Sequence, residues 1–147
     1  MARLPILNAE TAPEAARDGV RKAEAANGFI PNLIGLLANA PVALETYQTV
    51  SGINARSGLS LAEREAVQIT AAATHGCGFC VAGHTAIAYK KAGLTADVVD
   101  ALRANAHVPD ARLDAVAEFP RAVIRGRGAV ADAELAALKA AGFGDAN

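Results

Sequence analysis

Residues that start and stop helices divide the sequence into short segments, and no segment has the alternating Val/Ile/Thr-rich pattern of a β-strand. Two stretches, Thr11–Glu14 and Ser60–Glu63, resemble capping boxes at helix starts. Pro41 suits the first turn of a helix, whereas Gly28 and Gly93 suit helix ends. This punctuation predicts an all-α fold of about seven or eight helices with no sheet.

The expected helices follow an extended N-terminal arm, residues 1–10, and they cover roughly residues 14–26, 33–40, 41–57, 61–74, 77–91, 96–104, 110–125 and 132–141. A kink is expected at Pro120, inside the seventh helix. No repeat, low-complexity segment or linker divides the sequence. We therefore expect a single domain over residues 1–147, a length that can bury a real core.

Composition narrows the class of protein. Apolar residues make up 52% of the chain and aromatic residues only 4%, with no Trp, which favours close-packed helices. A formal net charge of −1 gives no electrostatic basis for binding nucleic acid or an anionic membrane. The apolar excess suggests that some surface is buried between subunits, so a homo-oligomer is expected. The sequence also shows no signal peptide and no membrane-spanning run, so we expect a cytoplasmic protein.

Both cysteines lie in the ten-residue stretch from His75 to His84, as a C-x-x-C pair formed by Cys77 and Cys80. Two sulfurs at this spacing can close a disulfide, so one thiolate can attack a substrate and the other can resolve the product. If the segment is helical from about Cys77, then Cys77, Cys80 and His84 share one stripe. His84 is then one turn from Cys80, where its imidazole could exchange a proton with that thiol. This neighbour predicts the lower pKa for Cys80.

Glu65 lies twelve residues before Cys77, on the preceding expected helix. It shares a helical stripe with Leu61, Ile69 and Ala72 rather than with solvated charges. Because a carboxylate on an apolar stripe is costly unless it has a partner, Glu65 is predicted to be buried and coupled to the thiol site.

The C-x-x-C pair has three other interpretations. The cysteines could be small core residues beside a hydrogen-bonded His84. Alternatively, Cys77, Cys80 and His84 could bind zinc, with His75 or Glu65 as a fourth ligand, although structural zinc sites usually draw ligands from two separated segments. A thioredoxin-type site would require a βαβ context, which the helical pattern does not offer.

The spacing Glu65–x11–Cys77–x-x–Cys80–x-x-x–His84 resembles the signature of the alkyl hydroperoxidase D-like (AhpD-like) proteins of the carboxymuconolactone decarboxylase superfamily. The resemblance covers about residues 28–105, and its flanking stretches are Ile30–Leu33, Ala40–Pro41, Leu59–Glu65 and Ala92–Thr95. It implies a helical, oligomeric antioxidant protein, a trimer or hexamer, whose cysteines cycle between dithiol and disulfide.

By this resemblance, Cys80 would attack the peroxide, Cys77 would resolve, and Glu65 and His84 would form the proton relay. One position departs from the family, because Phe79 stands where founding members carry a second histidine. His75 lies two residues before Cys77 and is a possible auxiliary group. The decarboxylase branch lacks the cysteine pair, so lactone decarboxylation is not expected.

The sequence therefore predicts a thiol-dependent peroxidase that reduces hydroperoxides without a bound cofactor. A protein dithiol or lipoyl-type reductant would restore the thiols by exchange. The alternative is a redox sensor or exchange protein whose C-x-x-C pair switches conformation without turning over peroxide.

Overall fold

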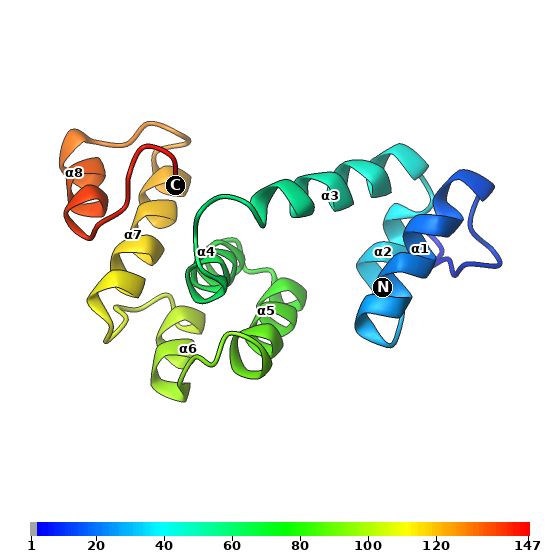
Figure 1. Cartoon of the computed structure of the whole chain (residues 1–147), viewed down its shortest axis with the longest axis horizontal. Helices are drawn as coiled ribbons and strands as arrows, with labels where there is room; N and C mark the ends of the chain where they lie inside the picture. Colours follow the sequence, from blue (N-terminus) through cyan, green and yellow to red (C-terminus); the bar gives the residue numbers. More distant parts are fainter. Residues whose placement is uncertain (1–2) are drawn as a thin grey trace. The chain divides into compact units, whose positions relative to one another are not determined.

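The structure, a computed structural model, describes residues 3–147, so the first two residues of the expected N-terminal arm lie outside the described residues. Over this range the fold is all-α, with eight helices and no strand, which confirms the predicted class (Figure 1). The helices are α1 (Glu14–Asn27), α2 (Asn32–Leu37), α3 (Pro41–Asn54), α4 (Leu61–Thr74), α5 (Gly78–Lys90), α6 (Ala96–Arg103), α7 (Ala111–Arg125) and α8 (Asp132–Ala140).

Two compact units make up this structure, divided between Arg56 and Ser57. In the first unit, α1 contacts both α2 and α3. Their shared core includes Val20, Ile34 and Leu44. The arm before α1 belongs to the same core, because the Leu7 amide donates a hydrogen bond to the carbonyl oxygen of Gly35.

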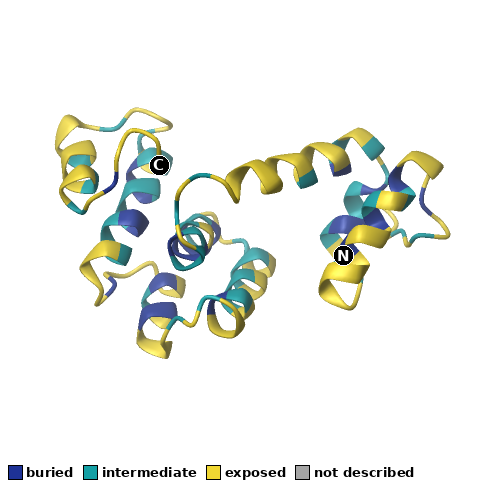
Figure 2. Ribbon diagram, in the orientation of Figure 1, coloured by how far each residue is buried: buried dark blue, intermediate teal, exposed yellow. Residues whose placement is uncertain are grey.

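The second unit, residues 57–147, is built around α4, which contacts α5, α6 and α7. Ile69 of α4 and Leu102 of α6 are fully buried in its core, and Phe143, beyond α8, also belongs to it. Figure 2 shows buried residues along α4, α6 and α7. The helix that carries Glu65 is therefore held in place by three other helices of this unit.

The capping predictions had mixed outcomes. Ser60 and Glu63 form the expected capping box at the start of α4, where each side chain accepts from the other residue's backbone amide. The predicted box at Thr11–Glu14 is wrong. Pro13 is the N-cap of α1 and gives no side-chain cap, while Thr11 instead joins a turn closed by the side chain of Asn8.

Glu63 also holds the C-terminal part of the unit. Its Oε1 accepts a hydrogen bond of 2.6 Å from Nε of Arg112, the second residue of α7. Arg112 donates in addition to the carbonyl of Ala141 and lies 4.0 Å from the ring centroid of Phe143. One guanidinium thus links the starts of α4 and α7 to the segment after α8.

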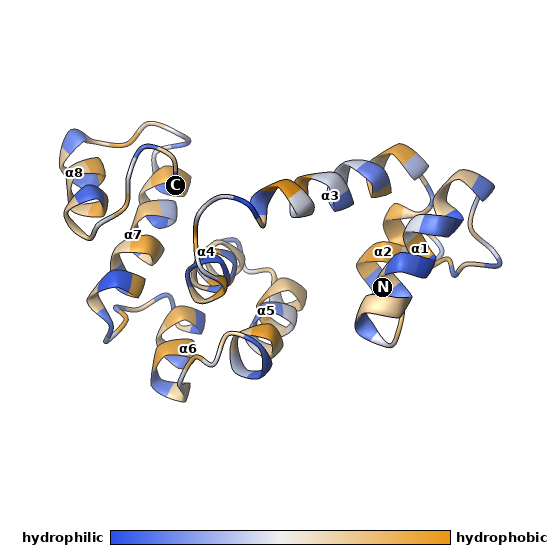
Figure 3. Ribbon diagram, viewed as in Figure 1, coloured by the Kyte–Doolittle hydropathy of each residue, from blue (hydrophilic) through white to orange (hydrophobic). Residues whose placement is uncertain are grey.

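Two of the described helices, α3 and α5, expose more than one large apolar side chain. On α3 the exposed large hydrophobic residues are Val42, Tyr47, Val50 and Ile53, and on α5 they are Phe79 and Tyr89. Figures 2 and 3 show exposed turns of α3 that are also hydrophobic. Within residues 3–147, no helix combines the length and apolar character needed to cross a bilayer.

Candidate functional site

A tight turn between α4 and α5 carries the cysteines. Gly76 has φ +68°, a left-handed conformation that a side chain disfavours, and its turn lets the Cys77 amide donate to the carbonyl of Ala72. Cys77 is the N-cap of α5, and its Sγ accepts a hydrogen bond of 3.4 Å from the backbone amide of Cys80. The turn therefore places a sulfur against the open amides at a helix N-terminus.

The two sulfur atoms lie 2.6 Å apart, and both cysteines are free and partly exposed. The thiol hydrogen bond from Cys80, followed by the Cys80 and Phe79 amides, holds the pKa of Cys77 below its ordinary value. The pKa of Cys80 is raised, first by the hydrogen bond to Cys77 and then by burial. The thiolate of the reduced pair is therefore favoured on Cys77.

These two directions are the reverse of the order expected from sequence. That order rested on His84 as a neighbour one turn from Cys80. Among the described residues, however, His84 makes no hydrogen bond to either sulfur, whereas the backbone of α5 makes one to Cys77. The hydrogen bond between the two thiols, followed by the amides at the start of α5, favours the charge on Cys77, and the imidazole makes no contact that would oppose it.

Glu65 is buried and coupled to the site residue His84, as predicted. Its side chain is only 7% exposed, and the Nδ1–H of His84 donates a hydrogen bond of 2.8 Å to its Oε2. Because the carboxylate must accept, this contact fixes the ring tautomer and leaves Nε2 available for proton transfer. Glu65 and His84 thus form a carboxylate–imidazole pair between α4 and α5.

The structure separates the remaining residues of the motif from this pair. His75 is the exposed C-cap of α4 and makes no hydrogen bond to the thiols or to His84 within residues 3–147, so its auxiliary role stays a prediction. Phe79 is 54% exposed at the first turn of α5. Its ring makes no contact that would replace a relay histidine among the described residues.

Sequence reasoning missed a second group of residues, which lines a groove along α5. A groove of about 440 Å³ is lined by Gly78, Val81, Ala82 and Thr85 of α5 and by Arg103 of α6. The four α5 positions are visible in sequence as a stripe, but Arg103 reaches them only through the packing of α6 on α5. No local sequence signal could have paired Arg103 with the C-x-x-C segment.

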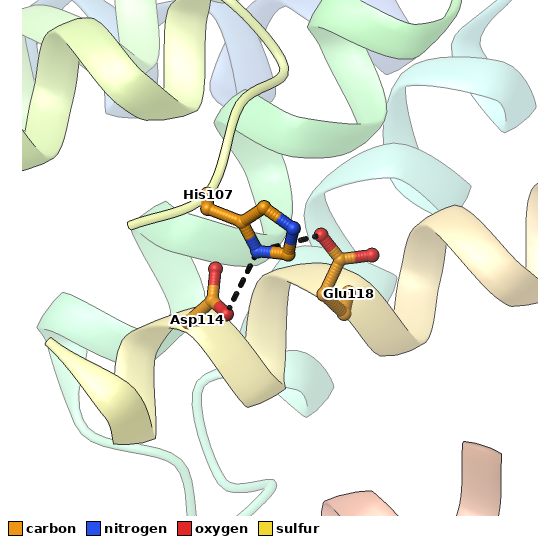
Figure 4. Close-up of side chains that lie close together, drawn as sticks. All are labelled: His107, Asp114 and Glu118. Atoms are coloured by element: carbon orange, nitrogen blue, oxygen red, sulfur yellow. Dashed lines mark hydrogen bonds and ion pairs between the residues drawn. The ribbon is translucent and has the colours of Figure 1, made fainter. Parts of the chain in front are cut away.

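The geometry does not favour the zinc interpretation. Within residues 3–147, the group of three His, Cys, Asp or Glu ligand atoms that lie within 4.8 Å of one another is formed by His107, Asp114 and Glu118, not by the thiols (Figure 4). In that cluster, Nδ1 of His107 lies 3.2 Å from Asp114 and 3.8 Å from Glu118. Glu118 also pairs with the buried Arg121, so we interpret the cluster as an ion-pair network that fastens the loop before α7.

Comparison with known proteins agrees with the helical fold that carries this site. The sequence profile of the carboxymuconolactone decarboxylase family matches residues 41–143, which span α3 to α8. The chain therefore belongs to the carboxymuconolactone decarboxylase family, and within it to the AhpD-like members. No curated protein matches the sequence.

Two solved structures resemble this chain closely in fold. One is a peroxidase-related protein from Ralstonia eutropha described as an alkylhydroperoxidase AhpD core, with 27% identity and a TM-score of 0.81 over 97% of this chain and 77% of that one. The other is a peroxidase-related protein from Silicibacter sp., with 21% identity and a TM-score of 0.80 over 98% of this chain and 76% of that one. The second shows the shared fold alone.

Proposed function

We propose that this protein is a thiol-dependent peroxidase that reduces hydroperoxides with Cys77 and Cys80. The observation that carries this proposal is the pair of free sulfurs, 2.6 Å apart at a helix N-terminus and backed by the Glu65–His84 pair. The likeness to peroxidase-related proteins supports it. The family's decarboxylase name does not, because nothing in a dithiol site decarboxylates a lactone.

The first step uses the thiolate on Cys77, which reverses the order implied by family resemblance. Its sulfur attacks the terminal oxygen of the hydroperoxide and the O–O bond breaks. Cys77 becomes a sulfenic acid, and the alkoxide takes up a proton and leaves as the alcohol. The substrate is reduced by two electrons, both taken from this sulfur.

The second step closes the disulfide, and here Cys80 needs a base because its pKa is raised. We assign this role to His84, whose Nε2 is left available by the hydrogen bond from Nδ1–H to Glu65. The Cys80 sulfur then attacks Cys77 and displaces hydroxide, which leaves as water with the proton from His84. The two steps together convert one hydroperoxide and two thiols into an alcohol, a water molecule and a disulfide.

A reductant must reopen the disulfide for a second turnover. We propose a protein dithiol or a lipoyl-type dithiol, which would attack one sulfur, pass through a mixed disulfide and release both thiols. A dithiol cycle of this kind operates in reducing surroundings, so a cytoplasmic location is part of the proposal. A homo-oligomer is also part of it, because α3 exposes large apolar side chains.

The experiment is multiple-turnover consumption of cumene hydroperoxide with dithiothreitol as the reductant. We expect many equivalents consumed per chain by the native protein and none by the Cys77→Ser, Cys80→Ser double variant. Consumption that stops after one equivalent, even with excess dithiothreitol, would reject the peroxidase and favour the redox sensor. The redox sensor is the alternative to test because Phe79 stands where founding members of the family have a second histidine in the proton relay.

A further inference from the structure

Phe79 is a large apolar residue that the fold leaves in solvent at the thiol turn. It is 54% exposed in the first turn of α5, although burying a phenylalanine side chain would stabilise the protein. After the Cys80 thiol and amide, the Phe79 amide also lowers the pKa of Cys77, and Cys80 is the next residue in the chain. The exposed ring therefore belongs to a residue that touches one reacting sulfur through its backbone and adjoins the other in sequence.

The backbone around Phe79 is open to another molecule. Apart from adjacent backbone, Gly76, Gly78 and Gly83 have no heavy atom within 4 Å of the place where a Cβ would stand. All three glycines are exposed, and both cysteines are partly exposed. Since a glycine carries no side chain, a partner can approach this turn closely.

The exposed face of α5 that begins at Phe79 carries no formal charge. Its exposed residues are spaced by one to four positions and are Phe79, Ala82, Gly83, Ala86 and Tyr89. From His75 to Tyr89 the sequence contains no Asp, Glu, Lys or Arg. Depletion of charged residues and enrichment of aromatic ones is typical of the centre of a protein–protein interface.

The proposed cycle identifies the molecule that covers this face. Each turnover leaves a Cys77–Cys80 disulfide, and a dithiol must then bring a sulfur into bonding distance of one of these two sulfurs. A protein interface of ordinary size covers about 800 Å² of each partner, so a protein whose own cysteine attacks here also covers Phe79. A lipoyl group on a flexible arm, by contrast, reaches the disulfide without laying its carrier's surface on Phe79.

We propose that Phe79 is the docking residue for the protein that reduces the disulfide, and that this reductant carries a cysteine dithiol on its own surface among apolar side chains. This assignment rests on the proposed peroxidase cycle and names the partner of its last step.

The exchange proceeds in two displacements. One thiolate of the reductant attacks one sulfur of the Cys77–Cys80 disulfide, the S–S bond breaks, and the other cysteine leaves as a thiolate and is protonated. The reductant's second thiol loses its proton and displaces the cysteine still held in the mixed disulfide. The reductant gives up two electrons and becomes a disulfide, and both thiols of this protein are restored.

The exchange step can be measured without peroxide. The protein is oxidised with diamide, and its reduction by reduced thioredoxin or by dithiothreitol is followed by acid quench and mass spectrometry. We expect the ratio of the rate constant for thioredoxin to that for dithiothreitol to fall at least tenfold in Phe79→Ala, since an apolar contact at the docking site is lost. Phe79→Leu should lie in between. Phe29→Ala, which removes a similarly exposed ring from the first unit, is the matched control and should keep the native ratio.

Two further readouts distinguish docking from an effect on the thiols. Phe79→Ala keeps the backbone amide, so the pH midpoint of Cys77 alkylation and the melting temperature should match those of the native protein. A shifted midpoint would show that the ring acts on the thiols and is not a docking contact. Because the face is uncharged, the thioredoxin rate should change little between low and high salt. A steep fall with salt would show that charged residues elsewhere dock the reductant.

Other occupants of the face give different results. No reduction by thioredoxin, or equal ratios for native and Phe79→Ala proteins, would overturn the inference. If a dihydrolipoyl domain reduces the disulfide faster than thioredoxin and Phe79→Ala leaves that rate unchanged, the reductant is an arm-borne dithiol and the docking assignment is wrong. If Phe79→Ala lowers the mass measured by sedimentation, a second copy of this chain covers the ring, and the assignment is again wrong.

The peroxidase and the docking residue can fail separately. If cumene hydroperoxide is consumed with dithiothreitol but the thioredoxin ratio does not depend on Phe79, the peroxidase stands and the inference fails. If no hydroperoxide is consumed but Phe79→Ala lowers the ratio, the peroxidase fails, and Phe79 docks the partner of a disulfide-exchange protein.

Discussion

His84 of α5 donates its Nδ1–H to Oε2 of Glu65 on α4, at 2.8 Å, so two helices each supply one half of a proton-transfer pair. The carboxylate is buried and the imidazole is partly exposed, which is the arrangement expected when one group orients the other. His84 lies one helical turn after Cys80, the thiol whose pKa is raised, and two turns after Cys77, the thiol whose pKa is lowered.

Glu65→Gln tests this pair. An amide can donate to the imidazole and so favour the tautomer with its proton on Nε2, which could not act as a base. We expect disulfide closure after addition of peroxide to slow by roughly tenfold to hundredfold. Stopped-flow measurement of closure, with thermal unfolding in parallel, checks it. Glu24→Gln, at an exposed glutamate of α1, is the control. Unchanged closure with a lower melting temperature would leave Glu65 a structural role only.

The order of the sulfurs is tested by two single variants. Cys80→Ser keeps the Cys77 thiol, which should form a sulfenic acid that dimedone traps and that over-oxidises for want of a resolving thiol. Cys77→Ser removes the Cys77 thiol that contributes most to the raised pKa of Cys80 but leaves the burial of Cys80, so Cys80 should react with peroxide more slowly than Cys77 does in Cys80→Ser. Mass spectrometry counts the adducts. Rapid trapping in Cys77→Ser alone would restore the order implied by family resemblance.

The pH profile of Cys77 should depend on its neighbour. The Cys80 thiol and amide lower the pKa of Cys77, so alkylation by iodoacetamide should reach half its maximal rate below the ordinary thiol value of about 8.5. Cys80→Ala removes the thiol hydrogen bond and should move this midpoint upward. A midpoint that stays in place would show that the helix N-terminus alone sets the pKa.

Glu63→Gln should destabilise the protein at neutral pH by about 1–2 kcal/mol, since it removes a charged partner of Arg112. Burial raises the pKa of Glu63, but the Ser60 amide and the Arg112 guanidinium outweigh it, and the net shift is downward from 4.5. A lowered pKa gives stability that is present above about pH 4.5 and is lost as the pH falls through the folded-state value. Urea unfolding at pH 7 and in acid should therefore show the native–variant difference shrinking in acid.

Exposed apolar residues of α3 lead us to expect a homo-oligomer, and family resemblance implies a trimer or hexamer. Sedimentation at micromolar concentration should give a mass above the 14.9 kDa of one chain. Val50→Glu should lower that mass, whereas Thr49→Glu, at its exposed polar neighbour, should not. A monomeric native protein would contradict the expectation.

Helix content was predictable because its signals are local. The bounds of α4 match because the Ser60–Glu63 capping box starts it and the His75-Gly76 turn ends it. Burial of Glu65 followed from its apolar stripe. Three features needed the folded backbone: the amide of Cys80 turned toward Cys77, the reach of Arg103 to α5, and the link from Glu63 to Arg112. Each depends on packing or on hydrogen-bond direction, which residue spacing does not encode.

Glu63 and Glu65 lie two positions apart on α4. Glu65 accepts a hydrogen bond from His84, whereas Glu63 accepts one from Arg112, whose guanidinium lies over the ring of Phe143. Phe143 is buried in the core of this unit. A substitution that loosens Phe143 therefore also loosens the contact that Arg112 makes with the start of α4, the helix on which the proton-transfer pair depends. A loss of peroxide reduction in a Phe143 variant would then report on the position of α4 and not on the thiols themselves.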